Sequence, residues 1–169
     1  MLERFKVPEK DRVYVAEGQI RTATEAIFRH SGVSVDEAAR STDVLITNDL
    51  RGVESHGVSN MLRHYVADYG TNKLNPTPEF KVVRESKTTM TIDADRALGT
   101  HVGPWAMQHA IDKAKEFGMG AVAVTNSGHL AGCGYYAMMA AQQGMIGHCM
   151  TAGGSHQTVP TFGSKPVMG

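Results

Sequence analysis

The chain has 169 residues, and its 17 Lys and Arg are balanced by 17 Asp and Glu, so the formal net charge near neutral pH is zero. This balance gives no electrostatic attraction to nucleic acid or to an anionic membrane surface, and we expect neither as a partner. No apolar run approaches the roughly 20 residues of a membrane span, and the first residues lack the apolar core of a signal peptide. The 2 cysteines lack CxxC spacing and suit a reducing compartment, so we expect a cytoplasmic protein.

Helices are predicted throughout the first part of the chain, which we assign to an N-terminal helical region over residues 1–75. Apolar residues near helical spacing predict a helix over 13–30. The segment Ser34-Val-Asp-Glu37 is typical of a capping box and opens a second helix that runs to Leu50. A third helix lies between Gly57 and Gly70.

Strands and helices alternate in the rest of the chain. Pro104 is expected in the first turn of its helix, where a missing N–H costs least. A strand over 121–125 is expected to be buried because its residues are almost all apolar. The resulting order predicts an α/β fold in which a helical cap is followed by a mixed sheet. Its strands are predicted at 80–84, 88–94, 121–125 and 145–150, and its helices at 104–118 and 135–143.

The last part of the chain, from Phe117 to Gly169, is almost free of charge, which restricts its chemistry. From Phe117 to Gly169 there is no Asp or Glu, so acid–base catalysis there has to use histidine. His129 follows the strand over 121–125, and open α/β sheets bind ligands at the carboxyl ends of their strands. Without a nearby carboxylate its pKa should stay near or below the free value of ~6.5, which suits an acid or base near neutrality. A purely structural histidine is the alternative.

A second histidine lies in the turn Ser55-His56-Gly57, between Arg51 and Arg63. An arginine can bind a carboxylate with two parallel hydrogen bonds, and a neutral histidine can add a donor, so these residues suit an anionic substrate. The alternative is a capped turn in which Ser55 or Gly57 begins the next helix.

Two other patterns carry weaker signals. Gly132-Cys-Gly-Tyr-Tyr-Ala137 matches the GxGxxA dinucleotide fingerprint, but the preceding strand ends too early and no acidic residue follows to hold a ribose hydroxyl. We interpret it as a glycine loop packed closely against a helix start, although a cofactor could lie there in another geometry. His148, Cys149 and His156 are not at a recognised ligand spacing, so no metal site is predicted.

Several strings occur in an order and spacing that are together specific, and through them the chain resembles the type-2 malate/L-lactate dehydrogenase family over most of its length. The resemblance implies a non-Rossmann, sulfolactate-dehydrogenase-like fold, in which residues 76–119 belong to a first α/β domain and 120–169 begin a nicotinamide-binding domain. Family members are longer, so we expect this chain to be an incomplete copy. The strings are Asp49–Gly57, Ile92–Gly99, Ala110–Lys115, Asn126–His129, Gly144–Gly147 and Val159–Gly163.

The resemblance also implies an activity and roles for individual residues. It implies a two-electron oxidoreductase, usually a homodimer, that uses NAD or NADP and interconverts a 2-hydroxy acid and a 2-keto acid. His129 resembles the family's proton acceptor or donor, and Ser55 and His56 resemble an element that faces substrate and nicotinamide, with His56 as a second catalytic residue. Cofactor contacts are implied within 151–155, at Thr151, Gly153 and Ser155.

One position departs from the family pattern. Many members carry an arginine four residues after this His56, and the present sequence has Asn60 there. Arg63, one helical turn further, is then an alternative partner for the substrate carboxylate, beside Arg51. A catalytically inactive truncated subunit or dimerisation module is the rival hypothesis to the dehydrogenase. A metal-dependent hydrolase that uses His129, His148 and His156 is a third.

Overall fold

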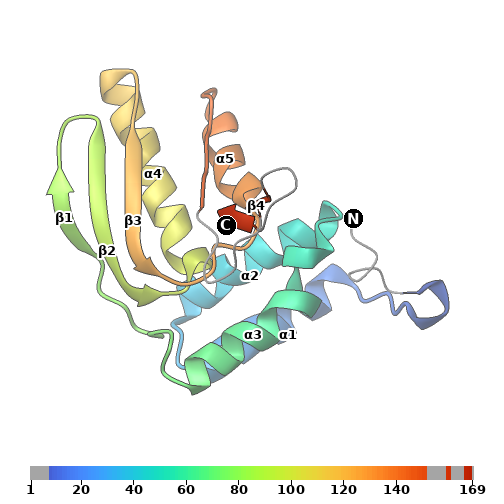
Figure 1. Cartoon of the computed structure of the whole chain (residues 1–169). Helices are drawn as coiled ribbons and strands as arrows, with labels where there is room; N and C mark the ends of the chain where they lie inside the picture. Colours follow the sequence, from blue (N-terminus) through green and yellow to red (C-terminus); the bar gives the residue numbers. More distant parts are fainter. Residues whose placement is uncertain (1–7, 152–158, 161–165, 169) are drawn as a thin grey trace.

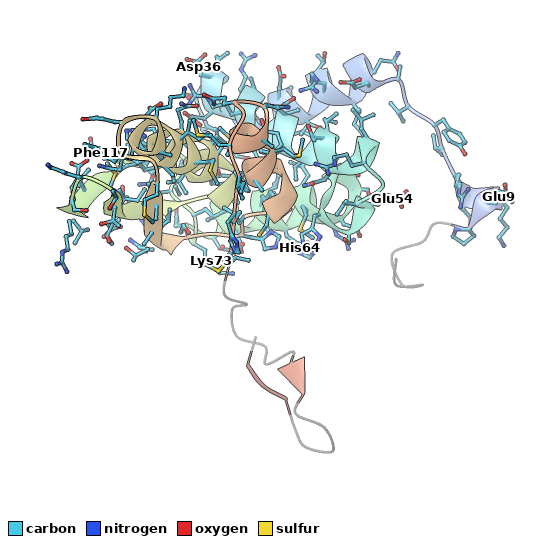
Figure 2. All side chains as sticks on the ribbon, turned by 90° about the horizontal axis from the view of Figure 1, so that it is seen from above. Glu9, Asp36, Glu54, His64, Lys73 and Phe117 are labelled. Carbon is cyan, nitrogen blue, oxygen red and sulfur yellow. The ribbon has the colours of Figure 1, made fainter. Side chains whose placement is uncertain are left out.

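The computed structural model describes residues 8–151, 159–160 and 166–168. A helical region and a small sheet lie side by side, and two further helices lie between them (Figure 1). From above, the labelled residues Phe117 and Glu54 lie toward opposite sides of this body, the first at the end of the helix that packs on the sheet and the second among the N-terminal helices (Figure 2). No helix in the described part of the chain is long and apolar enough to cross a membrane.

The elements follow the predicted order closely. The described α-helices are α1 (Glu17–His30), α2 (Val35–Leu50), α3 (Val58–Gly70), α4 (Gly99–Phe117) and α5 (Cys133–Ala141), with 3-10 turns η2 (Glu9–Asp11) and η3 (Glu54–His56). The described strands are β1 (Lys81–Glu85), β2 (Thr89–Ala97), β3 (Ala121–Ser127), β4 (Val159–Pro160) and β5 (Pro166–Met168). The predicted helical cap followed by an α/β part is therefore confirmed.

The main sheet has the strand order β1-β2-β3 and is mixed, as predicted. β1 pairs antiparallel with β2, whereas β2 and β3 run parallel and are joined by α4. Alternate residues of β2 point toward α4, so that Met90, Ile92 and Ala94 are buried and pack with Val102 and Ala106 of that helix. The period-2 pattern of a strand and the apolar stripe of a helix thus meet in one core.

A second core holds the helical region together. Its largest fully buried side chains include Phe28, Leu45, Tyr65 and Tyr136, which come from α1, α2, α3 and α5. Leu98, between β2 and α4, is also fully buried in this cluster. The helical cap is therefore packed directly onto the segment that connects the sheet to α4.

The start of α2 confirms half of the expected capping box. The hydroxyl of Ser34 accepts a hydrogen bond of 3.4 Å from the backbone N–H of Glu37. The Glu37 carboxylate does not reach back to the cap: it lies 3.0 Å from Arg40 and 3.1 Å from the nearly buried ring of His101 on α4. The contact between Glu37 and His101 thus takes the place of the expected hydrogen bond from Glu37 to the cap, and it links α2 to α4.

Pro104 does not lie in the first turn of its helix, contrary to the prediction. α4 begins at Gly99, directly after β2, and Pro104 lies inside it. Pro104 is the sixth residue of α4, beyond the N–H groups of the first turn that have no partner in the helix, so its missing N–H removes the bond to the carbonyl of Thr100. The predicted end is confirmed, since Gly118 closes α4 with a left-handed φ of 82°.

Two strand predictions need correction. β3 forms as expected, but it is not buried: its residues are exposed or half-exposed, because α4 covers one face only in the described chain. No strand forms over 145–150 in the described structure, where the sheet ends at β3. A groove of about 960 Å³ is instead bordered by α4, β3, α5 and this segment.

We expect Ile92→Ala to lower the free energy of unfolding by about 2–5 kcal/mol, because it removes a fully buried side chain from the core between β2 and α4. Val82→Ala is a matched control: Val82 pairs with Ile92 across the β1–β2 ladder but is 50% exposed. It should cost about 1 kcal/mol or less. Urea denaturation of both variants would measure the difference, and equal losses would contradict this packing.

Candidate active site

Two histidines that are far apart in the sequence lie next to each other in the fold. The rings of His56, in η3, and His129, just after β3, are stacked with their centroids 5.5 Å apart and their planes at 17°. The parallel pairing of β2 and β3 places Ser127 opposite Ala97, and the N–H of Gly128 donates a hydrogen bond of 2.7 Å to the carbonyl of Ala97. His129 therefore lies next to the point where β2 ends and α4 begins.

A glycine permits the close approach at this point. A Cβ atom built on Gly99, the first residue of α4, would lie 2.6 Å from both the carbonyl oxygen of His129 and the Cα of Leu130. Real Cβ atoms do not approach backbone so closely. The backbone of α4 and the backbone that carries His129 are thus in direct contact.

The turn that carries His56 is held by side chains from the end of α2 and the start of α3. The amide of the buried Asn48 donates a hydrogen bond of 3.1 Å to the carbonyl of His56. Asp49 accepts one of 2.9 Å from the N–H of Val58 and so caps α3, while burial raises the pKa of this carboxyl. The amide of Asn60 donates to the carbonyl of Glu54 at 2.8 Å.

The electrostatic surroundings of His129 favour its neutral form. Burial lowers its pKa below the usual value, and the neighbouring His56 and His64 lower it further. His129 as a whole residue is nevertheless exposed in the described part of the chain. Its Nδ1 atom lies 2.8 Å from the hydroxyl of Tyr65 and 3.3 Å from the backbone N–H of Ala131, and no carboxylate is among these contacts. A neutral imidazole near pH 7 can accept a proton.

Both histidines line a pocket of about 360 Å³. Four of the residues singled out from the sequence meet there: Arg51, His56, His129 and Thr151. The pocket also includes Asn48 and the start of α5 at 132–134.

The other sequence candidates lie elsewhere or outside the described residues. Ser55 is not among the described residues that line the pocket, and its hydroxyl shares a hydrogen bond of 2.9 Å with the Nδ1 of His56. Arg63 is exposed on α3 and is not among the described residues that line the pocket. Gly153 and Ser155 are outside the described residues, so their predicted cofactor contacts are not located.

Tyr65 was not singled out from the sequence as a functional residue. Its spacing places it on the apolar face of α3, where it is 2% exposed, and an apolar face is expected to form core. A buried tyrosine hydroxyl needs a hydrogen-bond partner, and this requirement is the signal by which the sequence could have pointed to Tyr65.

The GxGxxA match and the metal hypothesis can also be placed on the structure. β3 ends at Ser127, and residues 128–131 separate it from Gly132, so the tight strand-to-helix turn of the fingerprint is absent. Among the described residues, no group of three His, Cys, Asp or Glu side chains is arranged to hold a metal ion. His156, part of the metal hypothesis, is outside the described residues.

Comparison with known proteins gives consistent matches. A family model described as malate/L-lactate dehydrogenase matches residues 15–169. The malate dehydrogenase of Pyrococcus abyssi is 38% identical over 166 residues, which are 94% of this chain and 45% of that protein. The L-sulfolactate dehydrogenase of Methanocaldococcus jannaschii is 37% identical over 139 residues, or 82% of this chain and 40% of that protein.

Solved structures show the same similarity. The malate dehydrogenase from Pyrococcus horikoshii OT3 matches with a TM-score of 0.78 and 38% identity over 82% of this chain and 39% of that one. The sulfolactate dehydrogenase from Methanocaldococcus jannaschii matches with a TM-score of 0.75 and 34% identity over 78% and 38% of the two chains. The chain thus spans less than half the length of these relatives.

We expect Gly99→Ala to lower the free energy of unfolding by about 1–3 kcal/mol, since the new Cβ must push the backbone of His129 and Leu130 away. Gly18→Ala is the matched control, because Gly18 also lies near a helix start but has no atom within 4 Å of the place a Cβ would take. It should be neutral or stabilise by up to about 1 kcal/mol. Thermal denaturation of the two variants separates close packing from helix propensity, and the same shift in both would contradict the contact.

Proposed function

The chain belongs to the malate/L-lactate dehydrogenase family, and from this membership and the pocket geometry we propose that the whole protein interconverts a 2-hydroxy acid and a 2-keto acid with a nicotinamide cofactor. The observation that carries the proposal is the stacked pair of His56 and His129, which opens onto the same pocket as Arg51. The relatives are named for malate, sulfolactate and ureidoglycolate, each of which carries a hydroxyl group next to a carboxylate.

His129 is the acid–base group in this proposal. When a hydroxy acid is oxidised, the hydroxyl proton passes to the neutral imidazole; in the reverse direction the imidazolium returns a proton to the carbonyl oxygen. The lowered pKa of His129 keeps it unprotonated near neutral pH, which favours oxidation. Because oxidation needs the neutral form, its rate should fall as the pH drops through this pKa, and reduction should show the opposite limb.

Arg51 is the cation best placed for the substrate carboxylate. It lines the pocket with both histidines, whereas Arg63 is exposed on α3 and does not. Asn60, at the position where an arginine is common among relatives, is occupied by its hydrogen bond to the carbonyl of Glu54. A guanidinium beside the two histidines supplies the positive charge that a carboxylate needs.

The residues present fit part of a nicotinamide cofactor. A pocket of about 360 Å³ has the size for a small hydroxy acid with a nicotinamide ring, but it cannot enclose a dinucleotide. His56 and Thr151 line it and would hold the ring, with Gly153 and Ser155 as further expected contacts. When bound, NAD or NADP would supply the acceptor or donor for the hydride of the substrate carbon. The protein's part is to orient the substrate and move the proton.

A second hypothesis is a catalytically inactive subunit or dimerisation module. The two differ in a direct way: the complete protein either oxidises 2-hydroxy acids with NAD or NADP, or does not. We propose a homodimer in both cases, following the family resemblance, and its mass in solution would test this separately.

We expect His129→Ala in the complete protein to lower turnover by about 10²–10⁴-fold, because it removes the proton-transfer group. Binding of the nicotinamide cofactor should change little. His30→Ala, at the exposed end of α1, is the control and should keep full activity. Steady-state rates with malate, lactate and sulfolactate, together with cofactor titrations, measure both effects. A His129→Ala variant with nearly unchanged turnover would refute the assigned role.

We expect Arg51→Lys to raise KM for the hydroxy acid about tenfold or more, because a point ammonium cannot reproduce the two-pronged contact of a guanidinium. Arg63→Lys is the control, since Arg63 lies outside the described lining of the pocket. The measurement is KM for both variants over the same set of acids. A raised KM in Arg63→Lys alone would move the carboxylate site to α3.

A further inference from the structure

One buried side chain near the end of α2 touches both of the segments that carry the stacked histidines. Asn48 is only 4% exposed. Its backbone carbonyl accepts a hydrogen bond of 2.8 Å from the N–H of Val53, and its side-chain amide donates one of 3.1 Å to the carbonyl of His56. The turn that carries His56 is therefore bound to Asn48 at its beginning and at its end.

The side chain of Asn48 also lies against the loop that follows His129. A Cβ atom built on Gly132 would lie 2.5 Å from Oδ1 and 3.0 Å from Cγ of Asn48. The backbone of Gly132 is extended, with φ at −88°, a conformation that other residues adopt without strain. The packing against Asn48, and not the backbone conformation, is thus what requires a glycine at position 132.

Asn48 consequently lies between the two halves of the site. Its amide bonds to the backbone of His56 on one side and meets the chain three residues after His129 on the other. We propose that Asn48 is a positioning residue that sets the stack of His56 on His129, because it holds the backbone of the first and packs against the loop of the second. This inference rests on the proposed function and extends it to a residue that itself moves no proton.

The stack has an electrostatic consequence by which the role of Asn48 can be measured. Burial is the largest cause of the lowered pKa of His129, and the neighbouring His56 is the next. A positive charge on one ring disfavours a positive charge on the other, so a greater separation of the rings raises the pKa of His129. The titratable and charged groups around His129 are His56 from η3, His64 and Tyr65 from α3, and Arg51 and Cys133 along the pocket. Of these groups, His56 is the one whose backbone Asn48 holds.

The test is Asn48→Ala in the complete protein. NMR without substrate gives the pKa of His129, whose signal is assigned by its loss in His129→Ala. We expect this pKa to rise by about half a unit, the size of the repulsion between two unit charges in water at the 5.5 Å that separates the rings. Because oxidation needs the neutral ring, its acidic limb should move to higher pH, and kcat/KM should fall about tenfold.

Asn60→Ala is the matched control. The amide of Asn60 also donates to a carbonyl of the same turn, that of Glu54, but it does so from α3. Its removal should leave the pKa of His129 unchanged. An unchanged pKa in a folded Asn48→Ala, or the same rise in both variants, overturns the inference.

A second background separates positioning from a general loosening of the site. His56→Ala should by itself raise the pKa of His129. Adding Asn48→Ala to this variant should change the pKa no further, because Asn48 acts through His56. A further rise in the double variant would mean that Asn48 affects His129 by another route, and it overturns the inference.

Gly132→Ala tests the same contact from the other side, and it serves if Asn48→Ala does not fold. The new Cβ must displace the side chain of Asn48, so the pKa of His129 should rise as well. Gly134→Ala is its control, since a Cβ there would meet only Nη1 of Arg51, at 3.9 Å, and should leave the pKa unchanged. Equal pKa values in the two variants overturn the inference. If the shifts appear as expected but the wild type oxidises no 2-hydroxy acid, the proposed function fails while the role of Asn48 in positioning the rings stands.

Discussion

The close contact between the first turn of α4 and the backbone of His129 is the constraint on which the candidate site depends. β2 leads directly into α4, and parallel pairing brings β3 alongside, so the chain after β3 must cross the start of this helix. It can do so only because Gly99 has no side chain. Leu98, fully buried just before, fixes the same point to the helical cap. The two halves of the site, on the cap and after the sheet, are therefore held by one junction.

A histidine supported by neutral groups behaves differently from one paired with a carboxylate. A carboxylate stabilises the imidazolium and raises its pKa, whereas burial and neighbouring histidines lower that of His129. Tyr65 and the N–H of Ala131 orient the ring without adding negative charge. Arg51 lines the same pocket, so the site presents a histidine of lowered pKa and a cation together. This combination suits a substrate that brings its own negative charge.

Local sequence patterns were sufficient to predict the elements that short-range interactions stabilise. Helices α1, α2 and α3 follow from apolar spacing and from Ser34, whose hydroxyl caps α2 as expected. The predictions that failed concern residues whose structure depends on a partner far away in the sequence. Residues 145–150 are composed like a strand but have no neighbouring strand in the described sheet, and the carboxylate of Glu37 turns to His101 instead of to its own cap.

The sequence by itself indicated histidine for acid–base chemistry between Phe117 and Gly169, because no Asp or Glu lies in that stretch. The motif order also determined the family, which the comparisons confirm. Only the tertiary structure decided that the rings of His56 and His129 stack, that Arg51 rather than Arg63 is among the described residues that line their pocket, and that the Tyr65 hydroxyl lies 2.8 Å from Nδ1 of His129. Local periodicity predicts which face of a helix or strand is apolar. It does not predict which distant side chain contacts that face, because the contact depends on how the elements pack.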